Sequence, residues 1–493
     1  MLTKTDYAET AKSLTYPNQC LINGQWVSAK GGATFDTANP ADGTVLASLP
    51  ACKIEDVDAA VASARAAFDS GVWSALHPSE RKSVLVKLAE LIDSHTEELA
   101  VMEAIDAGKP ITDCLEIDVP ETSNCIRWHA EAQDKLYDQI APSAPDAVGL
   151  IVREPIGVVG AVLPWNFPLM MMAWKIGPAL ATGNSVIVKP AEQTSLTALR
   201  LAELALEAGV PPGVLNVITG MGPECGEPLG RHMDVDAITF TGSTEVGRLF
   251  LEFAAHSNMK EVCLEMGGKS AAVILEDAGD IAKIAEIQAN AIFWNMGENC
   301  TANSRIIAHK AVYDELVAEM VKQAQALSVG NQMDPDTQNG PLVSDEHYAK
   351  VAGMVATGKS QGAKLATGGA GAGGLMFQPT VFTEVTRDMD IFQDEIFGPV
   401  VGITKADSDE EAIALANDSA YGLAATLYTR DISKAHRFAR QLKAGTVGVN
   451  AYSEGEISTP FGGFKSSGFG GRDNGIHAHE QYTELKTIWI SLD

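Results

Sequence analysis

A cysteine and a glutamate in two glycine-containing loops are the residues of this chain best suited to covalent chemistry. Cys300 lies in Gly-Glu-Asn-Cys-Thr-Ala at 297–302, and Glu265 begins Glu-Met-Gly-Gly-Lys at 265–269. A thiolate adds to an aldehyde carbon, and a carboxylate can draw a proton from the water that hydrolyses the resulting thioester. Because a single Cys is more often a small buried hydrophobe and a Glu before Gly-Gly is more often turn chemistry, the pair needs further support.

Further short motifs lie on both sides of this pair. They are Pro-Trp-Asn-Phe-Pro at 164–168, Val-Lys-Pro-Ala-Glu-Gln-Thr at 188–194, Phe-Thr-Gly-Ser-Thr-Glu-Val-Gly at 240–247, Glu-Ile-Phe-Gly-Pro at 395–399 and Pro-Phe-Gly-Gly-Phe-Lys at 460–465. In this order, the motifs resemble those of the aldehyde dehydrogenase superfamily over nearly the whole chain. The resemblance implies an α/β fold with two Rossmann-like parallel-sheet domains and a β-arm for oligomerisation. It also implies NAD-dependent oxidation of an aldehyde.

The apolar periodicity predicts the elements that position these residues. Helices are predicted at 54–70 and 80–95. Between 157 and 275 strand and helix patterns alternate, which predicts a parallel sheet covered by helices. Such a sheet binds dinucleotides beyond the carboxyl ends of its strands. A second α/β run begins near Gly267 and contains Cys300, so we expect the active site in the cleft between two domains.

The resemblance divides the chain into three parts. Residues 1–133 and 154–264 are expected to form the NAD-binding domain, and 265–465 the catalytic domain. Segments 134–153 and 480–493 include alternating apolar and polar residues, the pattern of exposed strands, whose open edges need a cover. In the family these segments form an arm that pairs across subunits, so we expect a homo-oligomer, either a dimer or a tetramer. Pairing only within one chain is the alternative.

The composition argues against several classes of partner. With 64 acidic and 36 basic residues, the net charge of −28 repels nucleic acids and anionic membranes. The seven cysteines lack metal-ligand or CxxC spacing, which argues for a reducing compartment and against a structural metal. Residues 1–30 contain no apolar signal segment, and prolines interrupt the uncharged stretch 156–174, so we predict a cytoplasmic protein.

The resemblance assigns the catalytic roles. Cys300 is the nucleophile, and the Asn166 side-chain amide with the Cys300 backbone N–H forms the oxyanion hole. Hydride then passes to the nicotinamide, and Glu265 activates water for thioester hydrolysis. Glu298 stands where the family usually has Gln, and this carboxylate raises the pKa of the thiol if it points inward. Lys175 is interpreted as a structural cation near Glu265 or the sheet ends.

The cofactor-binding candidates also follow from the resemblance. Gly242 and Ser243 lie between a predicted strand and a predicted helix, where helix N–H groups favour pyrophosphate. Lys189 and Glu192 match the positions that hold the adenosine ribose. A Glu there accepts both ribose hydroxyls and repels a 2′-phosphate, which favours NAD over NADP. The remaining candidates are Glu395 and Phe397, which match the clamp on the nicotinamide ribose, and Trp165.

The substrate candidates are apolar tunnel walls and nearby acids. By correspondence with the family the walls are Phe167, Met171, Trp174 and Phe461. The loop 450–459 carries Glu454 and Glu456 close to the expected tunnel mouth, and Asp118 adds a third acid. Clustered acids attract the ammonium end of an ω-aminoaldehyde. The run 460–492 is similar to the bacterial γ-glutamyl-γ-aminobutyraldehyde dehydrogenases of putrescine catabolism.

The expected substrate is therefore an ω-amino or γ-glutamylamino aldehyde, and three other functions stay open. A broad aliphatic aldehyde or semialdehyde dehydrogenase is the first, although no Arg or Lys between 450 and 464 is available for a carboxylate-bearing substrate. A CoA-acylating enzyme would not need Glu265. A structural protein of the lens-crystallin kind need not keep Asn166, Glu265, Cys300 and Glu395 together.

Overall fold

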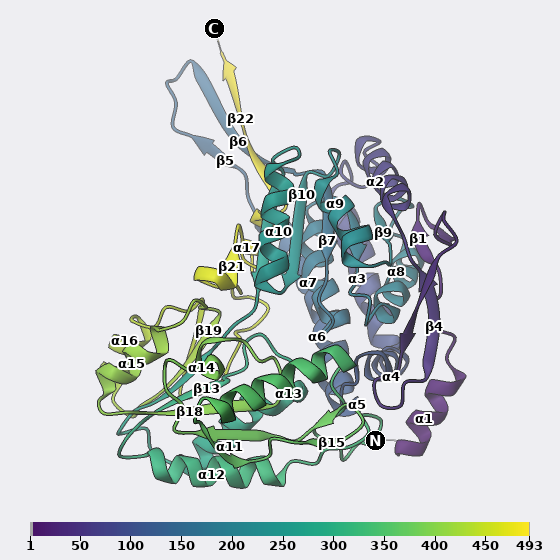
Figure 1. Ribbon diagram of the computed structural model, residues 1–493. Helices are drawn as coiled ribbons and strands as arrows, with labels where there is room; N and C mark the ends of the chain where they lie inside the picture. Colours follow the sequence, from purple (N-terminus) through teal and green to yellow (C-terminus); the bar gives the residue numbers. More distant parts are fainter. Residues whose placement is uncertain (1–2, 493) are drawn as a thin grey trace.

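The computed structural model describes residues 3–492, which form two α/β domains and a projecting arm (Figure 1). The first domain is built on an eight-stranded sheet, in which the strands from β9 to β11 are parallel, as the alternating pattern predicts. In spatial order its strands are β2 (Gln25–Val27), β1 (Cys20–Ile22), β9 (Leu215–Val217), β8 (Ser185–Lys189), β7 (Val158–Val162), β10 (Ala237–Gly242), β11 (Glu261–Met266) and β21 (Gly468–Phe469).

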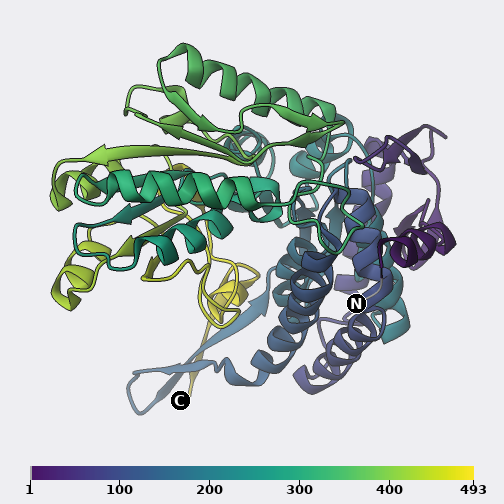
Figure 2. The same ribbon diagram turned by 90° about the horizontal axis from the view of Figure 1, so that it is seen from below.

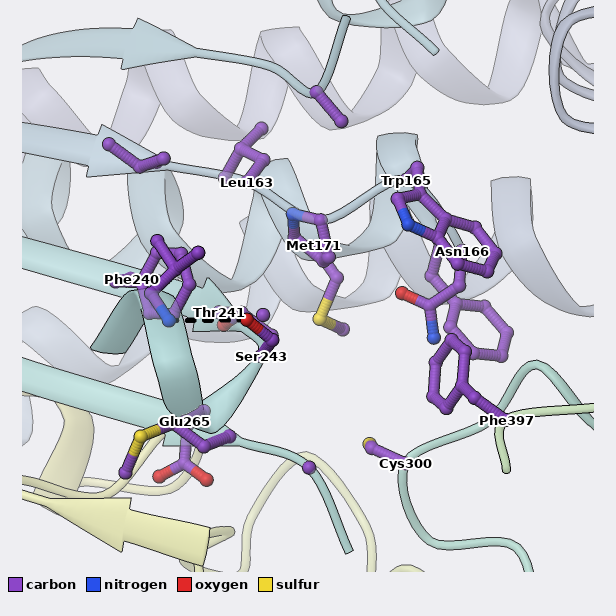
Figure 3. Close-up of a pocket in the computed structure, with 18 of the residues that line it drawn as sticks. Leu163, Trp165, Asn166, Met171, Phe240, Thr241, Ser243, Glu265, Cys300 and Phe397 are labelled. Carbon is purple, nitrogen blue, oxygen red and sulfur yellow. Dashed lines mark hydrogen bonds between the residues drawn. The ribbon is translucent and has the colours of Figure 1, made fainter. Parts of the chain in front are cut away.

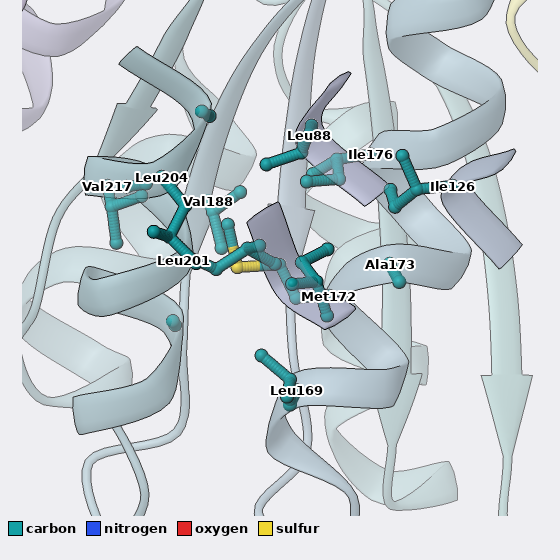
Figure 4. Packing of buried hydrophobic residues seen from close by; sticks show 14 of the residues in the cluster. Leu88, Ile126, Leu169, Met172, Ala173, Ile176, Val188, Leu201, Leu204 and Val217 are labelled. Carbon is teal, nitrogen blue, oxygen red and sulfur yellow. The ribbon is translucent and has the colours of Figure 1, made fainter. Parts of the chain in front are cut away.

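Helices cover both faces of this sheet. In β7, Val159 and Ala161 belong to one apolar core and Val158 and Val162 to another, because successive strand residues point to opposite faces. Figure 4 shows part of the first core. The helices in the first core are α3 (Pro78–Ser94), α4 (Thr96–Ala107), α6 (Val119–Ala132), α7 (Pro168–Ala181) and α8 (Leu196–Ala208), and those in the second are α2 (Ile54–Asp69), α9 (Glu227–Arg231) and α10 (Thr244–Ala255). The helices predicted at 54–70 and 80–95 are thereby confirmed.

The second domain is built on a seven-stranded sheet that is parallel except for β14. In spatial order its strands are β14 (Lys364–Thr367), β17 (Thr380–Thr383), β18 (Val400–Ala406), β13 (Arg305–His309), β12 (Ala271–Ile274), β19 (Ala424–Tyr428) and β20 (Thr446–Val449). Its main helices are α11 (Ile281–Phe293), α12 (Tyr313–Ala326), α13 (Asp345–Ser360), α15 (Asp409–Asn417) and α16 (Ile432–Ala439).

The arm is an antiparallel sheet in the order β22 (Thr483–Ser491), β6 (Ala147–Pro155), β5 (Gln139–Ala141). It extends away from both domains and carries the C-terminal end of the chain (Figures 1 and 2). Strands β6 and β22 pair with each other within the chain, from Thr483 opposite Pro155 to Ser491 opposite Ala147. Large apolar side chains nevertheless stay exposed along the arm, among them Ile140, Leu485 and Trp489.

The remaining elements are short or peripheral. They are α1 (Lys4–Ser13), β3 (Thr34–Ala38), β4 (Val45–Pro50), α5 (Ile111–Asp113), β15 (Gly371–Gly373), β16 (Met376–Phe377), α14 (Asp390–Gln393) and α17 (His477–Glu480). The uncharged stretch 156–174 contains β7 and the first half of α7. Within residues 3–492, none of the helices has the length and apolar character needed to cross a membrane.

Candidate active site

A cavity of about 380 Å³ lies between the carboxyl ends of the first sheet and the loops of the second domain (Figure 3). It brings together all the predicted site residues except Glu456 and Asp118. Those that line it are Trp165, Asn166, Phe167, Met171, Trp174, Lys189, Glu192, Gly242, Ser243, Glu265, Cys300, Glu395, Phe397, Glu454 and Phe461. Segments far apart in the sequence therefore meet at one site.

Three glycines explain how the cysteine, glutamate and ribose-clamp loops come so close together. A Cβ would lie 2.2 Å from the Gly398 oxygen at Gly297, 2.4 Å from the Cys300 oxygen at Gly268 and 2.2 Å from Glu395 Oε2 at Gly267. At Gly297 and Gly268 the nearest atoms are backbone oxygens, so only glycine permits the contacts. A side chain at Gly267 would displace the Glu395 carboxylate. The Gly-Gly pair after Glu265 is thus required by close packing against two other loops, rather than by a turn alone.

Asn166 lies opposite Cys300, and its side-chain amide points toward the cysteine (Figure 3). The side chain is buried, and its Nδ2 donates to the Glu298 carbonyl oxygen at 2.9 Å. Its own backbone oxygen accepts from Asn295 Nδ2 at 3.2 Å. An amide nitrogen carries two protons, so the second proton of Asn166 Nδ2 is available to an oxyanion formed at Cys300.

The Cys300 thiol lies in surroundings that disfavour its charged form. Burial is the largest cause that raises its pKa well above the usual value, followed by the carboxylates of Glu454, Glu395 and Glu265. The thiolate is the reactive form of cysteine. Ionisation of Cys300 therefore depends on how these surrounding charges are compensated.

Glu298 does not point at the Cys300 thiol, and it is not among the main groups that raise the pKa of that thiol. Its buried carboxylate accepts a hydrogen bond from the Val343 backbone N–H at 3.2 Å and lies 3.5 Å from His347 Nε2. His347 Nε2 in turn donates to the Phe397 carbonyl at 2.6 Å. Burial lowers the pKa of His347 to about 4, and its ring packs against Trp165 with ring centres 4.9 Å apart.

Glu265 is buried at the end of β11 without a hydrogen-bond partner for Oε2 among the described residues. Burial is the largest cause that raises its pKa well above the usual value, and the carboxylate of Asp473 adds to this effect. Lys175 opposes the shift and forms a buried ion pair with Asp473 at 2.6 Å. The interpretation of Lys175 as a cation near Glu265 is confirmed, whereas no local motif pointed to its partner Asp473.

The nucleotide end of the cavity carries groups that fit NAD. Ser243 caps α10, with its Oγ accepting from the Val246 N–H at 3.2 Å, and the first turn of this twelve-residue helix follows Gly242. Lys189 Nζ donates to Glu192 Oε2 at 3.3 Å, which leaves a carboxylate for ribose hydroxyls. At the other end, Glu395 Oε1 accepts from the Gly268 N–H at 2.7 Å. Helix N-termini suit pyrophosphate, and carboxylates suit ribose hydroxyls.

Aromatic and methionine side chains form the wall of the cavity next to Asn166. Phe167 and Met171 are largely buried, and Trp174 packs against Phe461 with ring centres 5.0 Å apart. Trp294, which the motifs did not point to, lies against Phe167 at 5.3 Å. These surfaces suit the aliphatic part of an aldehyde.

Glu454 is the acid of the loop 450–459 that reaches the cavity. The half-buried side chain accepts hydrogen bonds at Oε1 from the Tyr452 hydroxyl at 3.0 Å, from Asn299 Nδ2 at 3.1 Å and from Thr301 Oγ1. Asn299 and Thr301 are the two sequence neighbours of Cys300. The carboxylate is thus held against the cysteine loop.

The other two predicted acids are not at the cavity, and these expectations are corrected. Glu456 is exposed and does not line the cavity, because the turn closed by the Thr459 N–H and the Glu456 carbonyl at 2.8 Å keeps it outside. Asp118 is fully buried and paired with Lys109 at 2.5 Å. Lys109 Nζ lies 3.8 Å from the centre of the Phe167 ring, so the pair supports the tunnel wall from behind. Its charge is neutralised there.

Across residues 3–492, no group of three or more His, Cys, Asp or Glu side chains is placed to hold a metal ion. The cysteines other than Cys300 are buried and unbridged. The chemistry of the cavity is therefore described from its thiol, carboxylates and amide.

Comparisons with known proteins agree with this site. The model for the aldehyde dehydrogenase family matches residues 26–488. The chain is 52% identical to an aminoacetaldehyde dehydrogenase of Pseudomonas aeruginosa, over 99% of each chain. It is 47% identical to the NADP/NAD-dependent aldehyde dehydrogenase PuuC of Escherichia coli, over 99% of this chain and 98% of that one. A solved indole-3-acetaldehyde dehydrogenase in complex with NAD+ superposes with a TM-score of 0.99 at 46% identity, over the full length of both chains. This chain belongs to the aldehyde dehydrogenase family.

Proposed function

We propose that this protein oxidises an aldehyde bearing an amino or glutamylamino group to the carboxylate, with NAD as the hydride acceptor. The observation that carries the proposal is the Glu454 carboxylate, which lines the aldehyde cavity beside Cys300. No Lys or Arg lies between 450 and 464 to favour an acidic substrate instead. The similar enzyme named for aminoacetaldehyde supports an amino aldehyde as the substrate.

The prediction of NAD as cofactor is confirmed by the NAD+ complex of the similar structure and by the fit of the cavity. Lys189 and Glu192 would hold the adenosine ribose. Gly242 and Ser243, at the start of α10, would receive the pyrophosphate. Glu395 and Phe397 would hold the nicotinamide ribose, and the Phe397 ring packs against Trp165 with ring centres 5.2 Å apart. The nicotinamide supplies hydride acceptance.

The chain's own residues carry out the remaining steps. The Cys300 thiolate attacks the aldehyde carbon, and the carbonyl π electrons move to oxygen. Asn166 Nδ2 and the Cys300 N–H donate to that oxyanion. Its collapse expels hydride and leaves a thioester on Cys300. Glu265 then takes a proton from water, the hydroxide attacks the thioester, and the carboxylate leaves as the thiolate is restored.

A broad aliphatic aldehyde is the second candidate substrate, favoured by the apolar wall of Phe167, Met171, Trp174 and Phe461. The two candidates differ in what Glu454 contributes. A charge-assisted hydrogen bond between Glu454 and an ammonium contributes about 1.5–3 kcal/mol, roughly a ten- to hundredfold preference. An apolar aldehyde gains nothing from the carboxylate.

The test is the initial rate of NADH formation with 4-aminobutanal, its γ-glutamyl derivative, butanal and succinic semialdehyde at fixed NAD. We expect kcat/KM to favour the amine or glutamylamino substrates. Glu454→Gln should remove the preference, and Glu456→Gln is the matched control because Glu456 lies outside the cavity. Equal or higher kcat/KM for butanal in the unsubstituted protein would contradict the proposal.

We further propose that the NAD-binding domain consists of residues 1–133 and 154–264, and that the catalytic domain consists of residues 265–465. We propose that the protein acts in the cytoplasm. We also propose that the arm, 134–153 with 480–493, joins subunits into a dimer or tetramer. The exposed Leu485 and Trp489 support the assembly, because a second copy would cover them. Light scattering of the purified protein tests it, and a monomeric mass would contradict it.

A further inference from the structure

Glu454 is tied to the cysteine loop on both sides of the nucleophile. Asn299 Nδ2 donates to it at 3.1 Å, and Thr301 Oγ1 also donates. The Tyr452 hydroxyl contacts both Glu454, at 3.0 Å, and Thr301, at 2.8 Å. The carboxylate therefore cannot shift without disturbing the residues that flank Cys300.

One oxygen of this carboxylate is left over. All three bonds go to Oε1, and Oε2 receives no hydrogen bond from any described residue. Because Glu454 lines the cavity, a ligand has access to a carboxylate whose other oxygen is already fixed. An ammonium group is the natural partner for such an oxygen.

The charges that act most strongly on the thiol are all negative. They belong to Glu454, Glu395 and Glu265, with Glu454 the largest of the three. Glu395 is bound by the Gly268 N–H and belongs to the cofactor site, and the pKa of Glu265 is itself raised well above its usual value. Glu454 is thus the charge that a substrate can compensate.

The other ionisable groups around the cavity do not take over this task. Lys175 is paired with Asp473, and Lys189 is paired with Glu192 at the nucleotide end. Lys350 and His347 also line the cavity. Lys350 lowers the pKa of Glu395, and His347 donates to the Phe397 carbonyl. Next to Glu454 itself stands Tyr452, whose pKa is raised well above the usual value by burial and by Glu454.

We propose that Glu454 couples the charge of the substrate to the ionisation of Cys300, so that a bound ammonium group promotes the thiolate that attacks the same molecule's aldehyde. The idea rests on the proposed function, because it presumes a cationic substrate. The S–H bond of Cys300 breaks, its electron pair stays on sulfur and the proton passes to water. The ammonium remains protonated throughout, so it acts only through its charge.

The expected size of the effect follows from the loss of one neighbouring negative charge. Such a charge at close range shifts a pKa by about one unit or more, and each unit raises the thiolate fraction about tenfold below the pKa. An uncharged aldehyde of the same shape leaves Glu454 uncompensated. The two substrates should therefore differ in the pH at which chemistry becomes fast, in addition to any difference in binding.

The test uses 3-aminopropanal and butanal, which have the same number of heavy atoms. The end of the chain away from the aldehyde is an ammonium group in the first and a methyl group in the second. Single-turnover NADH formation is measured at saturating substrate and NAD across a range of pH. In the plot of this rate against pH, we expect the rising limb, where the rate increases with pH, to lie about one pH unit lower for 3-aminopropanal than for butanal. In Glu454→Gln the two limbs should coincide, while Glu456→Gln should keep the separation.

A second measurement does not depend on the Glu454 variant. The ultraviolet absorbance of the thiolate is followed when the unreactive 3-aminopropan-1-ol binds to the unsubstituted protein with NAD, with butan-1-ol as the neutral probe and Cys300→Ala as the blank. We expect an increase with the amino alcohol only. No increase, or an equal one with butan-1-ol, would overturn the coupling.

The outcomes separate this inference from the proposed function. If kcat/KM favours the amine and loses that preference in Glu454→Gln, but both substrates share one rising limb, Glu454 only anchors the substrate and the coupling is wrong. If the limbs separate without a preference in kcat/KM, the coupling holds and the proposed substrate class is wrong. If neither is seen, both are overturned.

Discussion

Two carboxylates act on Cys300 from the ends of different sheets, and their surroundings are opposite in kind. Glu265, at the end of β11, is buried with Oε2 unpartnered among the described residues, and its pKa is raised. Glu454, on the loop after β20, is half-buried and has three donors around Oε1. A group that must gain and lose a proton keeps one oxygen free of a partner, whereas a group that recognises charge is held in place by donors.

The first prediction removes the thiol on which both carboxylates act. Cys300→Ala should reduce NADH production by at least about 10⁴-fold, because the covalent route is lost. NAD affinity should stay the same, because none of the proposed ribose or pyrophosphate contacts is made by the Cys300 side chain. Steady-state NADH absorbance and calorimetric titration with NAD measure the two quantities. Retained turnover would show that neither carboxylate serves this cysteine.

The second prediction separates the two carboxylates by the step that each affects. Glu265→Gln should lower the steady-state rate by about 10²- to 10⁴-fold, because water is no longer activated. Hydride transfer precedes that step, so one equivalent of NADH per active site should still form as a burst. Rapid-mixing absorbance detects the burst, and Glu454→Gln is the comparison, because it leaves Glu265 in place to activate water. If burst and steady rate fell together, Glu265 would act before hydrolysis.

The third prediction concerns pH. Both Cys300 and Glu265 work in their deprotonated forms, and both have a raised pKa. Activity should therefore be low at neutral pH and rise into the alkaline range, by about tenfold per pH unit for each group that is still protonated. A profile of kcat against pH checks this, with Glu265→Gln in the first turnover isolating the limb of the thiol. A profile that is flat or falls above neutral pH would contradict the raised values.

The smallest effect is expected at Glu298, a third carboxylate near Cys300 in sequence. Glu298→Gln should change kcat/KM by less than about threefold, since a Gln oxygen can still accept from the Val343 N–H. The iodoacetamide alkylation rate of Cys300 should also be unchanged. A tenfold change in that rate would place Glu298 beside Glu265 and Glu454 as a group that controls the thiol.

Much of the first domain could be predicted because its strands and helices are long enough to show a period. The short strands β1, β2 and β21, at the two ends of the sheet, were not predicted, because two or three residues display no alternation. The arm strands did show their pattern. Their pairing with each other, however, depends on residues from opposite parts of the chain.

The site shows the same division between local and distant information. Motif residues such as Asn166 and Cys300 were identified because their neighbours in sequence identify them. Asp473 was missed because its meaning comes from Lys175, 298 residues away. Asp118 was misplaced because the sequence displays a charge but not the buried cation that neutralises it.

The glycine contacts among the three active-site loops bear on how such an enzyme can diversify. Gly268 and Gly297 leave no room for a side chain against the backbone of the facing loops, so the nucleophile and the ribose clamp form one closely packed frame. The segment 450–459 touches the cysteine loop of this frame through the hydrogen bonds of Tyr452 and Glu454. Selection for a new aldehyde can therefore act on one replaceable loop while the oxidising machinery is inherited unchanged.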